Sequence, residues 1–340
     1  MDGLAKASIL DIDGVAVPSA IAAPAAAYSV RLLDTAVGVP TYTGVAMRVR
    51  RDTAGGTGDD DEADIAFDTS LTDPTISLDS AISNASAGVT ATTLGQFLNV
   101  GTVNGTTYTN PDSLTVTASC YVDEWKDQSG NAYHAEQATH GSQPQIHDGT
   151  VNTDLIQENG KPALKWTGSE ELNYTWPDGV GSTQDFGEDY FWFSVASPTA
   201  GAARPVLFVQ GGTNINTRMG TFYDTSSDLI MVLRVAQVAT ITSSTTLTAG
   251  QKLLGLQGEF TSESDRDFTS YLNTSNVGTV NFTTTYNDNA GPAVFWFLRI
   301  GAQYTQNFTG TQQEHIMYGT DMVANRTGIE SDINTYFRIY

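Results

Sequence analysis

The chain has 340 residues, and its 38 acidic against 16 basic residues give a formal net charge of −22. A surface this acidic repels nucleic acid and anionic membranes, so we expect no nucleic-acid partner. A single cysteine excludes an intrachain disulfide and a cysteine metal site, and no apolar run reaches the roughly 18 residues of a membrane-spanning helix, so we expect no membrane insertion.

Residues 1–26 differ from the rest of the chain, because they are rich in Ala and Pro with Ile and Val at alternating positions. Such a segment buries too little apolar surface to fold by itself. We therefore predict an extended N-terminal arm over residues 1–26 that is ordered by partner subunits. Residues 27–340 are predicted to form a single domain.

Two strands are predicted near the start of this domain. Val45, Met47 and Val49 alternate with arginines, which is typical of a half-buried strand. Residues 63–67 would form its hairpin partner. A short helical turn or strand is expected over residues 94–98.

The loop between these two strands carries the consecutive acids of residues 59–62. We expect a solvated loop that Arg48, Arg50 and Arg51 neutralise. The alternative is a Ca2+ site, because calcium is bound by carboxylate oxygens. Its candidate ligands are Asp59, Asp61 and Asp64.

The stretch Cys120–Trp166 contains the most distinctive sequence. The run 127–131 (DQSGN) is rich in turn-forming residues. The run 143–146 (QPQI) is predicted to be an edge segment, because Pro cannot donate a hydrogen bond to a neighbouring strand. The run 159–162 (NGKP) predicts a tight turn before a strand at 163–166, and Cys120 is expected to be a buried apolar residue.

Eight further strands are predicted after Trp166, because apolar runs recur between turns without helical periodicity. They are Tyr190–Val195, Pro205–Val209, Leu229–Val235, Lys252–Phe260, Phe268–Leu272, Val277–Phe282, Ala293–Ile300 and Gln313–Tyr318. A terminal helix is expected over residues 328–337, with Ile329, Ile333 and Phe337 on its buried face. Thr327 and Glu330 have the spacing of an N-terminal capping box.

These motifs carry a resemblance. DQSGN, QPQI and ENGKPAL, together with the closing strand and helix, resemble the concanavalin-A-like (laminin-G-type) modules of tailed-bacteriophage structural proteins. The block over residues 27–67 resembles the opening of the catalytic domain of B-type α-L-arabinofuranosidases. The resemblance implies an all-β fold, a concanavalin-A-like antiparallel β-sandwich (jelly roll) with a short C-terminal helix and the extended arm.

The resemblance also allows a test for catalysis. A retaining glycosidase needs two carboxylates about 5–5.5 Å apart. In the arabinofuranosidase family a catalytic Glu follows an aromatic–Gly–Asn strand end, and the corresponding residues 207–214 contain no carboxylate. Asp288 could match the second acid but lacks a partner, and Asp185, Glu188 and Asp189 are expected to form a polar loop. We therefore expect no catalytic residues and a protein that is not an enzyme.

Histidines and aromatic residues supply the remaining candidates. His134, His140 and His147 lie in one loop, at spacings that do not match a helical metal pair. We expect surface or turn histidines, with a metal site that includes Asp148 as the alternative, and a structural role for His315. Four aromatic residues either cap the ends of the sandwich or form a sugar platform, and they are Tyr174, Trp176, Tyr223 and Tyr304.

The expected function is a structural protein of a tailed-phage virion, displayed on the particle surface as capsid decoration, spike or tail fibre. It would be anchored by the arm, contact other virion proteins and self-associate. A lectin-like tail protein that binds host surface glycans is the first alternative. A glycosidase that degrades polysaccharide is the second. Apart from the Ca2+ alternative, no cofactor is expected.

Overall fold

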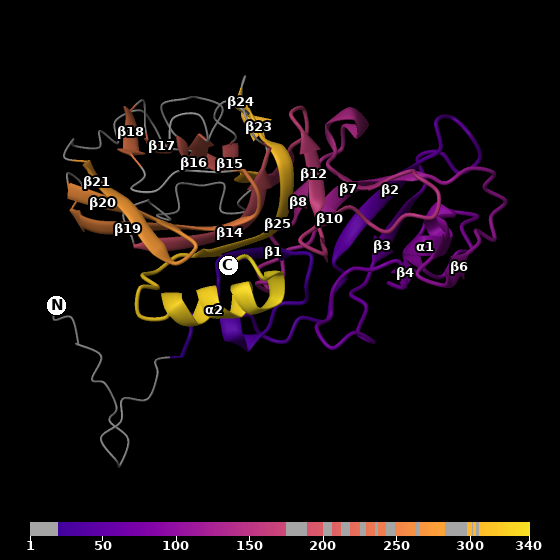
Figure 1. Cartoon of the computed structure of the whole chain (residues 1–340), viewed down its shortest axis with the longest axis horizontal. Coiled ribbons are helices and arrows are strands. Elements are labelled where there is room, and N and C mark those ends of the chain that lie inside the picture. Colours follow the sequence, from indigo (N-terminus) through magenta and orange to yellow (C-terminus); the bar gives the residue numbers. More distant parts are fainter. Residues whose placement is uncertain are drawn as a thin grey trace, which may run out of the picture.

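The computed structural model describes residues 20–174, 189–199, 206–211, 218–224, 229–234, 237–242, 249–262, 265–282, 298–300, 302–303 and 306–340 (Figure 1). Most of the predicted arm, residues 1–19, lies outside this range. The described end of the arm belongs to the fold. The Ala25 N–H donates to the Met317 carbonyl at 2.7 Å, and Ala26 begins the first strand.

The described residues of the first half form short strands and one short helix. They are β1 (Ala26–Ser29), β2 (Met47–Asp52), β3 (Glu62–Ile65), β4 (Ile82–Ser83), α1 (Leu94–Leu98), β5 (Gly101–Val103), β6 (Thr106–Tyr108), β7 (Ser119–Trp125), β8 (Ala135–Glu136), β9 (Gln145–Asp148), β10 (Gln157–Glu158), β11 (Lys161–Pro162), β12 (Leu164–Thr167) and β13 (Leu172–Tyr174). Two 3-10 turns lie at Thr35–Val37 and His140–Ser142.

The second half contributes the longer strands and the terminal helix. They are β14 (Tyr190–Pro198), β15 (Val206–Gly211), β16 (Arg218–Asp224), β17 (Leu229–Arg234), β18 (Gln237–Thr242), β19 (Lys252–Ser262), β20 (Asp265–Leu272), β21 (Ser275–Phe282), β22 (Leu298–Ile300), β23 (Ala302–Gln303), β24 (Gln306–Asn307), β25 (Thr309–Tyr318) and α2 (Arg326–Phe337). The predicted strands in this half are confirmed over their described residues, and residues 205, 235 and 293–297 lie outside the described ranges.

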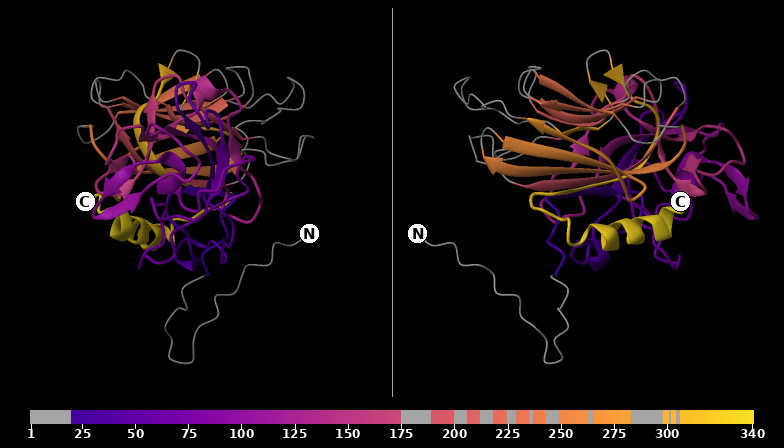
Figure 2. Two further views of the ribbon diagram at one scale, coloured as in Figure 1. Left: turned by 90° about the vertical axis from the view of Figure 1, so that its right-hand side faces the viewer. Right: turned by 60° about the vertical axis from the view of Figure 1, so that its left-hand side comes forward.

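The pairing is antiparallel throughout the described strands, and it folds the sheet into two layers (Figures 1 and 2). The lower layer runs β21–β20–β19–β14–β25, and the upper layer contains β15 to β18 (Figure 1). The short strands β2, β3, β7, β9 and β12 extend the sheet beyond β25. The predicted all-β antiparallel sandwich is confirmed.

Strand β14 is apolar on both sides because it lies in the middle of the molecule. All nine of its residues are buried. The rings of Phe191 and Phe193 stack with centroids 4.5 Å apart, and Phe193 meets Tyr318 of β25 edge to face. The helix α2 lies beneath this layer (Figure 1), so both faces of β14 are covered, as its continuous apolar run predicts.

The terminal helix packs as predicted but starts differently. Ile329, Ile333 and Phe337 are fully buried. The predicted capping box is wrong. Asn325 is the N-cap residue and its side chain makes no capping hydrogen bond, and the Glu330 carboxylate instead accepts from Arg326 Nη1 at 2.7 and 2.8 Å. Glu330 pairs with Arg326 and not with the helix N-terminus because Glu330 is buried, and an ionised buried carboxylate needs a charged partner.

Strand β9 corrects a second prediction. It pairs with β7 on one side and with β12 on the other, so it is an interior strand and not an edge. Pro144 is accommodated because it stands just before the strand, and its carbonyl accepts from the Val122 N–H at 2.8 Å. A Pro at this position removes no hydrogen bond from the strand itself.

The DQSGN turn holds the beginning of the domain in place. We call Asp127, Gln128, Ser129 and Asn131 the clasp. Asp127 accepts from the Ala27 N–H at 2.8 Å, Gln128 accepts from the Leu33 N–H at 2.9 Å, and Asn131 donates to the Ala25 carbonyl at 2.9 Å. Gln128 also donates to the carbonyls of Ser29 and Arg31. The clasp therefore fixes residues 25–33 against β7.

Candidate functional site

One face of the sheet carries a row of polar side chains that crosses six strands. Neighbouring members oppose each other directly in the strand register, so their side chains point to the same side of the sheet. All of them except the buried Arg50 reach solvent. We call this set the outer row, and its members from β3 to β25 are Glu62, Arg50, Tyr121, Gln145, Lys165 and Thr311.

The centre of the outer row is held by hydrogen bonds. Arg50 donates from Nε to Gln143 Oε1 at 2.9 Å and from Nη1 to Asp60 Oδ1 at 2.7 Å. Its guanidinium carbon lies 5.0 Å from the centroid of the Tyr121 ring, and Gln145 donates to the Tyr121 hydroxyl at 3.4 Å. The ring and its polar neighbours are thus positioned before any ligand arrives, which lowers the entropic cost of binding.

A carboxyl group with a shifted pKa lies beside the row. Asp123 stands in β7 where the register with β2 shifts, and its Oδ1 accepts from Gln143 Nε2 at 2.9 Å. Burial, and then the negative charge of Glu62, raises the pKa of Asp123. A carboxyl that keeps its proton to higher pH can donate that proton to a sugar oxygen.

This arrangement suits a ligand with many hydroxyl groups. The outer row presents a carboxylate, a phenol, an amide, an ammonium and a hydroxyl on one side of a sheet. Sugar hydroxyls both donate and accept, so they can pair with each of these groups. The Tyr121 ring adds an apolar surface for the CH groups of a sugar.

The candidate calcium ligands Asp59, Asp61 and Asp64 are bound by other groups of the chain. Asp59 accepts from the backbone N–H groups of Thr53 and Gly55 at 2.8 and 3.0 Å. Asp64 pairs with Arg48 Nη1 at 3.0 Å. No group of three or more metal-binding side chains occurs in the part of the chain that the structure describes.

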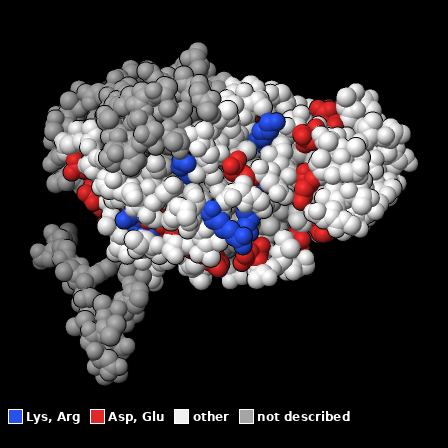
Figure 3. Space-filling model, in the orientation of Figure 1, with Lys and Arg blue, Asp and Glu red and all other residues white. Residues whose placement is uncertain are grey.

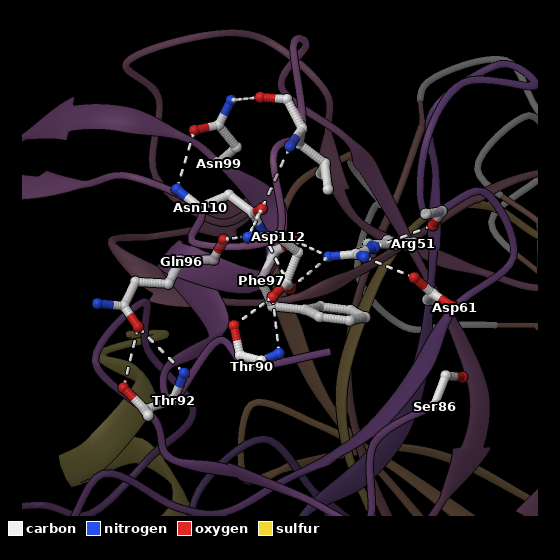
Figure 4. Close-up of polar contacts among 12 residues, drawn as sticks. Arg51, Asp61, Ser86, Thr90, Thr92, Gln96, Phe97, Asn99, Asn110 and Asp112 are labelled. Carbon is white, nitrogen blue, oxygen red and sulfur yellow. Dashed lines mark hydrogen bonds and ion pairs between the residues drawn. The ribbon is translucent and has the colours of Figure 1, made fainter. Parts of the chain in front are cut away.

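The third candidate ligand, Asp61, meets an arginine. Arg51 is buried, its Nη2 lies 2.5 Å from Asp61 Oδ2 and its Nη1 lies 3.6 Å from Asp112 Oδ2 (Figure 4). The same guanidinium donates to the carbonyls of Gly58 and Phe97. Arginines therefore supply the positive charge of this loop, as the sequence predicts.

The four side chains of the candidate aromatic platform lie outside the described part of the structure. Trp176 and Tyr304 lie outside the described residues. Tyr174 ends β13 and Tyr223 lies in β16, where the structure describes the backbone course alone. Tyr121, which was not among the candidates, has a described ring beside polar groups of the outer row. The sequence signal that could have found it is its place in the alternating pattern of β7.

The three clustered histidines are not brought together. The Asp127 N–H donates to His134 Nδ1 at 3.1 Å, and His140 Nδ1 lies 3.2 Å from Asp60 Oδ1. His147 corrects the prediction, because it is fully buried in β9 and its Nδ1 accepts from the Gly149 N–H at 3.1 Å. His147 faces the core because it directly opposes the buried Cys120.

His315 is structural, as predicted. It is buried in β25, and burial lowers its pKa to about 3, so the imidazole is neutral. Its Nε2 lies 3.2 Å from Gln312 Oε1, which places the proton on Nε2. Its Nδ1 then accepts from the Ser194 hydroxyl at 2.9 Å.

Comparisons with known proteins identify relatives by structure alone. The sequence matches no family model and no curated protein. A GH54 α-L-arabinofuranosidase soaked with a cyclic sulfate inhibitor matches with a TM-score of 0.55 at 13% identity, over 91% of this chain and 62% of that one. A glutamate-to-glutamine mutant of a GH54 α-L-arabinofuranosidase, soaked with 4-nitrophenyl α-L-arabinofuranoside, matches with a TM-score of 0.53 at 13% identity over the same shares. The Ruminococcus gnavus IT-sialidase CBM40 matches with a TM-score of 0.37 at 11% identity, over 50% of this chain and 97% of that one.

These neighbours correct one expectation. The expectation that the protein is not an enzyme is contradicted, because a glycoside hydrolase shares its sandwich over 91% of the chain. At 13% identity the likeness establishes the fold, and the chain spans 62% of the length of that hydrolase.

No helix in the described ranges is both long and apolar enough to cross a membrane.

Proposed function

We propose that this chain is a glycan-recognition protein of a tailed-phage particle and that the outer row contacts the sugar. The observation that carries the proposal is the outer row itself, because six directly opposed polar side chains cross six strands and one of them, Tyr121, supplies an aromatic ring. The ligand class is a glycan that contains furanose sugars, since the arabinofuranosidase sandwich has the same fold. The resemblance of the DQSGN, QPQI and ENGKPAL blocks to phage modules supports the proposal that the chain belongs to a phage particle.

Binding to the outer row is tested with two variants in the full chain. Tyr121→Ala removes the stacking surface and Gln145→Ala removes an amide, so each should weaken binding of an arabino-oligosaccharide by about tenfold. The matched control is Thr279→Val, an exposed residue on β21 whose hydroxyl lies 2.9 Å from that of Thr269. Isothermal titration calorimetry measures the affinities. Equal affinity of all three variants would refute the outer row as the site.

The particle is tested separately. Antibodies against this chain should label the surface of purified phage particles in electron microscopy, and mass spectrometry should detect the chain in them. Loss of residues 1–19, which leaves β1 and the contacts of Ala25 in place, should abolish this labelling. Particles that never contain the chain would contradict the virion part of the proposal and leave the glycan part standing.

A glycoside hydrolase is the second candidate, and the fold shared with the arabinofuranosidase over 91% of the chain favours it. The substrate to test is 4-nitrophenyl α-L-arabinofuranoside, and release of 4-nitrophenol is the measurement. Asp123 is the carboxyl to replace, because its raised pKa suits a proton donor. Activity that Asp123→Asn reduces by about a hundredfold or more would support hydrolysis at this face. No activity in the wild-type chain would refute this candidate.

A further inference from the structure

Two cations lie together at the C-terminal end of α2. Lys161 belongs to β11, and Arg338 is the residue that ends the helix. Figure 3 shows Lys and Arg side chains gathered in this part of the surface. Arg338 is exposed and Lys161 is half-buried, so both are accessible to a ligand.

The backbone fixes the two cations relative to each other. Asn159 starts the turn that leads to Lys161, and its Nδ2 donates to the carbonyls of Phe337 and Arg338 at 2.8 and 2.6 Å. The Lys161 ammonium lies 3.9 Å from the centroid of the Tyr336 ring. The turn, the ring and the helix end are therefore one rigid unit.

Neither cation has an ion-pair partner among the described residues. No carboxylate oxygen lies within 4.0 Å of either one, whereas the nearby Arg31 is paired with Glu314 at 2.8 Å and with Asp332 at 2.7 Å. Burial, opposed by the charge of Asp73, lowers the pKa of Lys161, and the positive charges of Arg338 and Arg31 lower it further. In a chain with 38 acidic residues, two adjacent cations that make no ion pair within 4.0 Å need a reason.

The helix dipole offers a structural reason, since cations stabilise a helix C-terminus. The backbone conformation of Arg338 shows that the helix dipole is not the whole reason. Arg338 has φ 54° and ψ 52°, a left-handed conformation that favours Gly or Asn at this position. A Gly would end the helix with less strain, so an arginine at this position lowers the stability of the helix end.

We propose that Lys161 and Arg338 form a binding site for the carboxylate of an acidic saccharide. The guanidinium fork can bind a carboxylate through two hydrogen bonds, and the ammonium adds a second charge. An acidic glycan would be repelled by most of this surface, so an unpaired basic pair is where its charge can be accepted. The inference rests on the proposed glycan recognition and adds the charge of the ligand.

The test uses the full chain labelled with nitrogen-15 and two probes, trigalacturonate and neutral arabinotriose. Trigalacturonate should shift the backbone amide signals of residues 159–161 and 336–340, and arabinotriose should not. Lys161→Met keeps the packing on Tyr336 but removes the charge, and it should weaken trigalacturonate binding by about tenfold. Lys252→Met, a half-buried lysine on β19, is the charge-matched control and should bind as the wild type does.

Arg338→Gly separates the binding role from the capping role. It should raise the melting temperature, because Gly adopts the left-handed conformation without strain, and it should weaken trigalacturonate binding by about tenfold. Unchanged binding in both Lys161→Met and Arg338→Gly overturns the site. A different result would show that only the outer row is wrong as the sugar site. In that case Tyr121→Ala would leave the affinity for arabinotriose unchanged, while galacturonate monosaccharide would still shift the signals of residues 159–161.

Discussion

The clasp and the outer row are both polar, and strand β7 connects them, yet they serve opposite purposes. In the clasp, Asp127 is 1% exposed and its two oxygens accept four hydrogen bonds from within the chain. In the outer row, most side chains reach solvent and keep groups available to a ligand. The difference teaches that the densest sequence motif of this chain serves the fold. The surface suited to binding comes from residues without a motif.

The largest effect is expected from the clasp. Asp127→Ala should lower the free energy of unfolding by about 3–5 kcal/mol, since each buried donor left without a partner costs about 1–3 kcal/mol. The backbone N–H groups of Ala27, Ser129 and Tyr133 would lose their acceptor. Urea unfolding followed by tryptophan fluorescence measures the change. Asp127→Asn retains one acceptor oxygen and should lose about half as much. A loss below 1 kcal/mol in Asp127→Ala, about the value of one hydrogen bond, would refute the clasp.

The next effect concerns Arg51, which plays a structural role although it adjoins the acidic loop. Arg51→Met should cost about 2–4 kcal/mol, because Asp61 and Asp112 would lose the cation that balances their charge in a largely buried site. Arg48→Met is the matched control. Its side chain is 22% exposed, so its ion pairs should contribute at most about 1 kcal/mol. Denaturant midpoints decide the question, and equal losses in the two variants would contradict the difference in burial.

The third effect is a dependence of folding stability on pH. Burial alone would raise the pKa of Asp112, but hydrogen bonds from Thr90 and the charge of Arg51 lower it. A lowered pKa in the folded state means that this stabilisation is present above the unfolded pKa of about 4 and is lost as the pH falls through the folded value. Thr90→Val should therefore make stability less sensitive to pH below about 4. Parallel stability curves for wild type and variant would argue against this assignment.

The smallest effect has the opposite sign and belongs to the binding face. The pKa of Asp123 is raised, so its contribution to stability is present below the unfolded pKa and is lost as the pH rises through the folded value. Asp123→Asn should thus stabilise the chain at neutral pH, by less than about 1 kcal/mol because the group is partly exposed. Thermal melts at pH 4 and pH 7 measure it. A variant less stable than the wild type at pH 7 would show that the carboxylate stabilises the fold.

The fold could be predicted because it depends on regular patterns. The alternation of Val45, Met47 and Val49 identifies β2, and the continuous apolar run at 190–195 identifies the buried β14. Local rules failed where tertiary partners competed with them. Glu330 pairs with Arg326 and does not form the predicted capping box. Pro144 borders an interior strand, because its ring lies before the first paired residue.

The candidate site could not be predicted in the same way. The outer row joins residues from positions 50 to 311, and strand register, which sequence does not give, brings them to one face. The DQSGN turn could be recognised as a turn, but its partners lie about a hundred residues earlier in the chain. Charge pairing was easier to predict, because Arg48, Arg50 and Arg51 lie close in sequence to the acids that they bind.

The position of β1 has a consequence for how the protein is made. β1 lies against β25, where the Ser29 hydroxyl donates to Glu314 across a separation of 285 residues. β1 therefore cannot find its partner until the ribosome has synthesised β25, about 285 residues later in the chain. Contacts this distant in sequence slow folding and leave strands unpaired in the meantime. The nascent domain must stay soluble through that interval, and a net charge of −22, which keeps copies apart, helps it to do so.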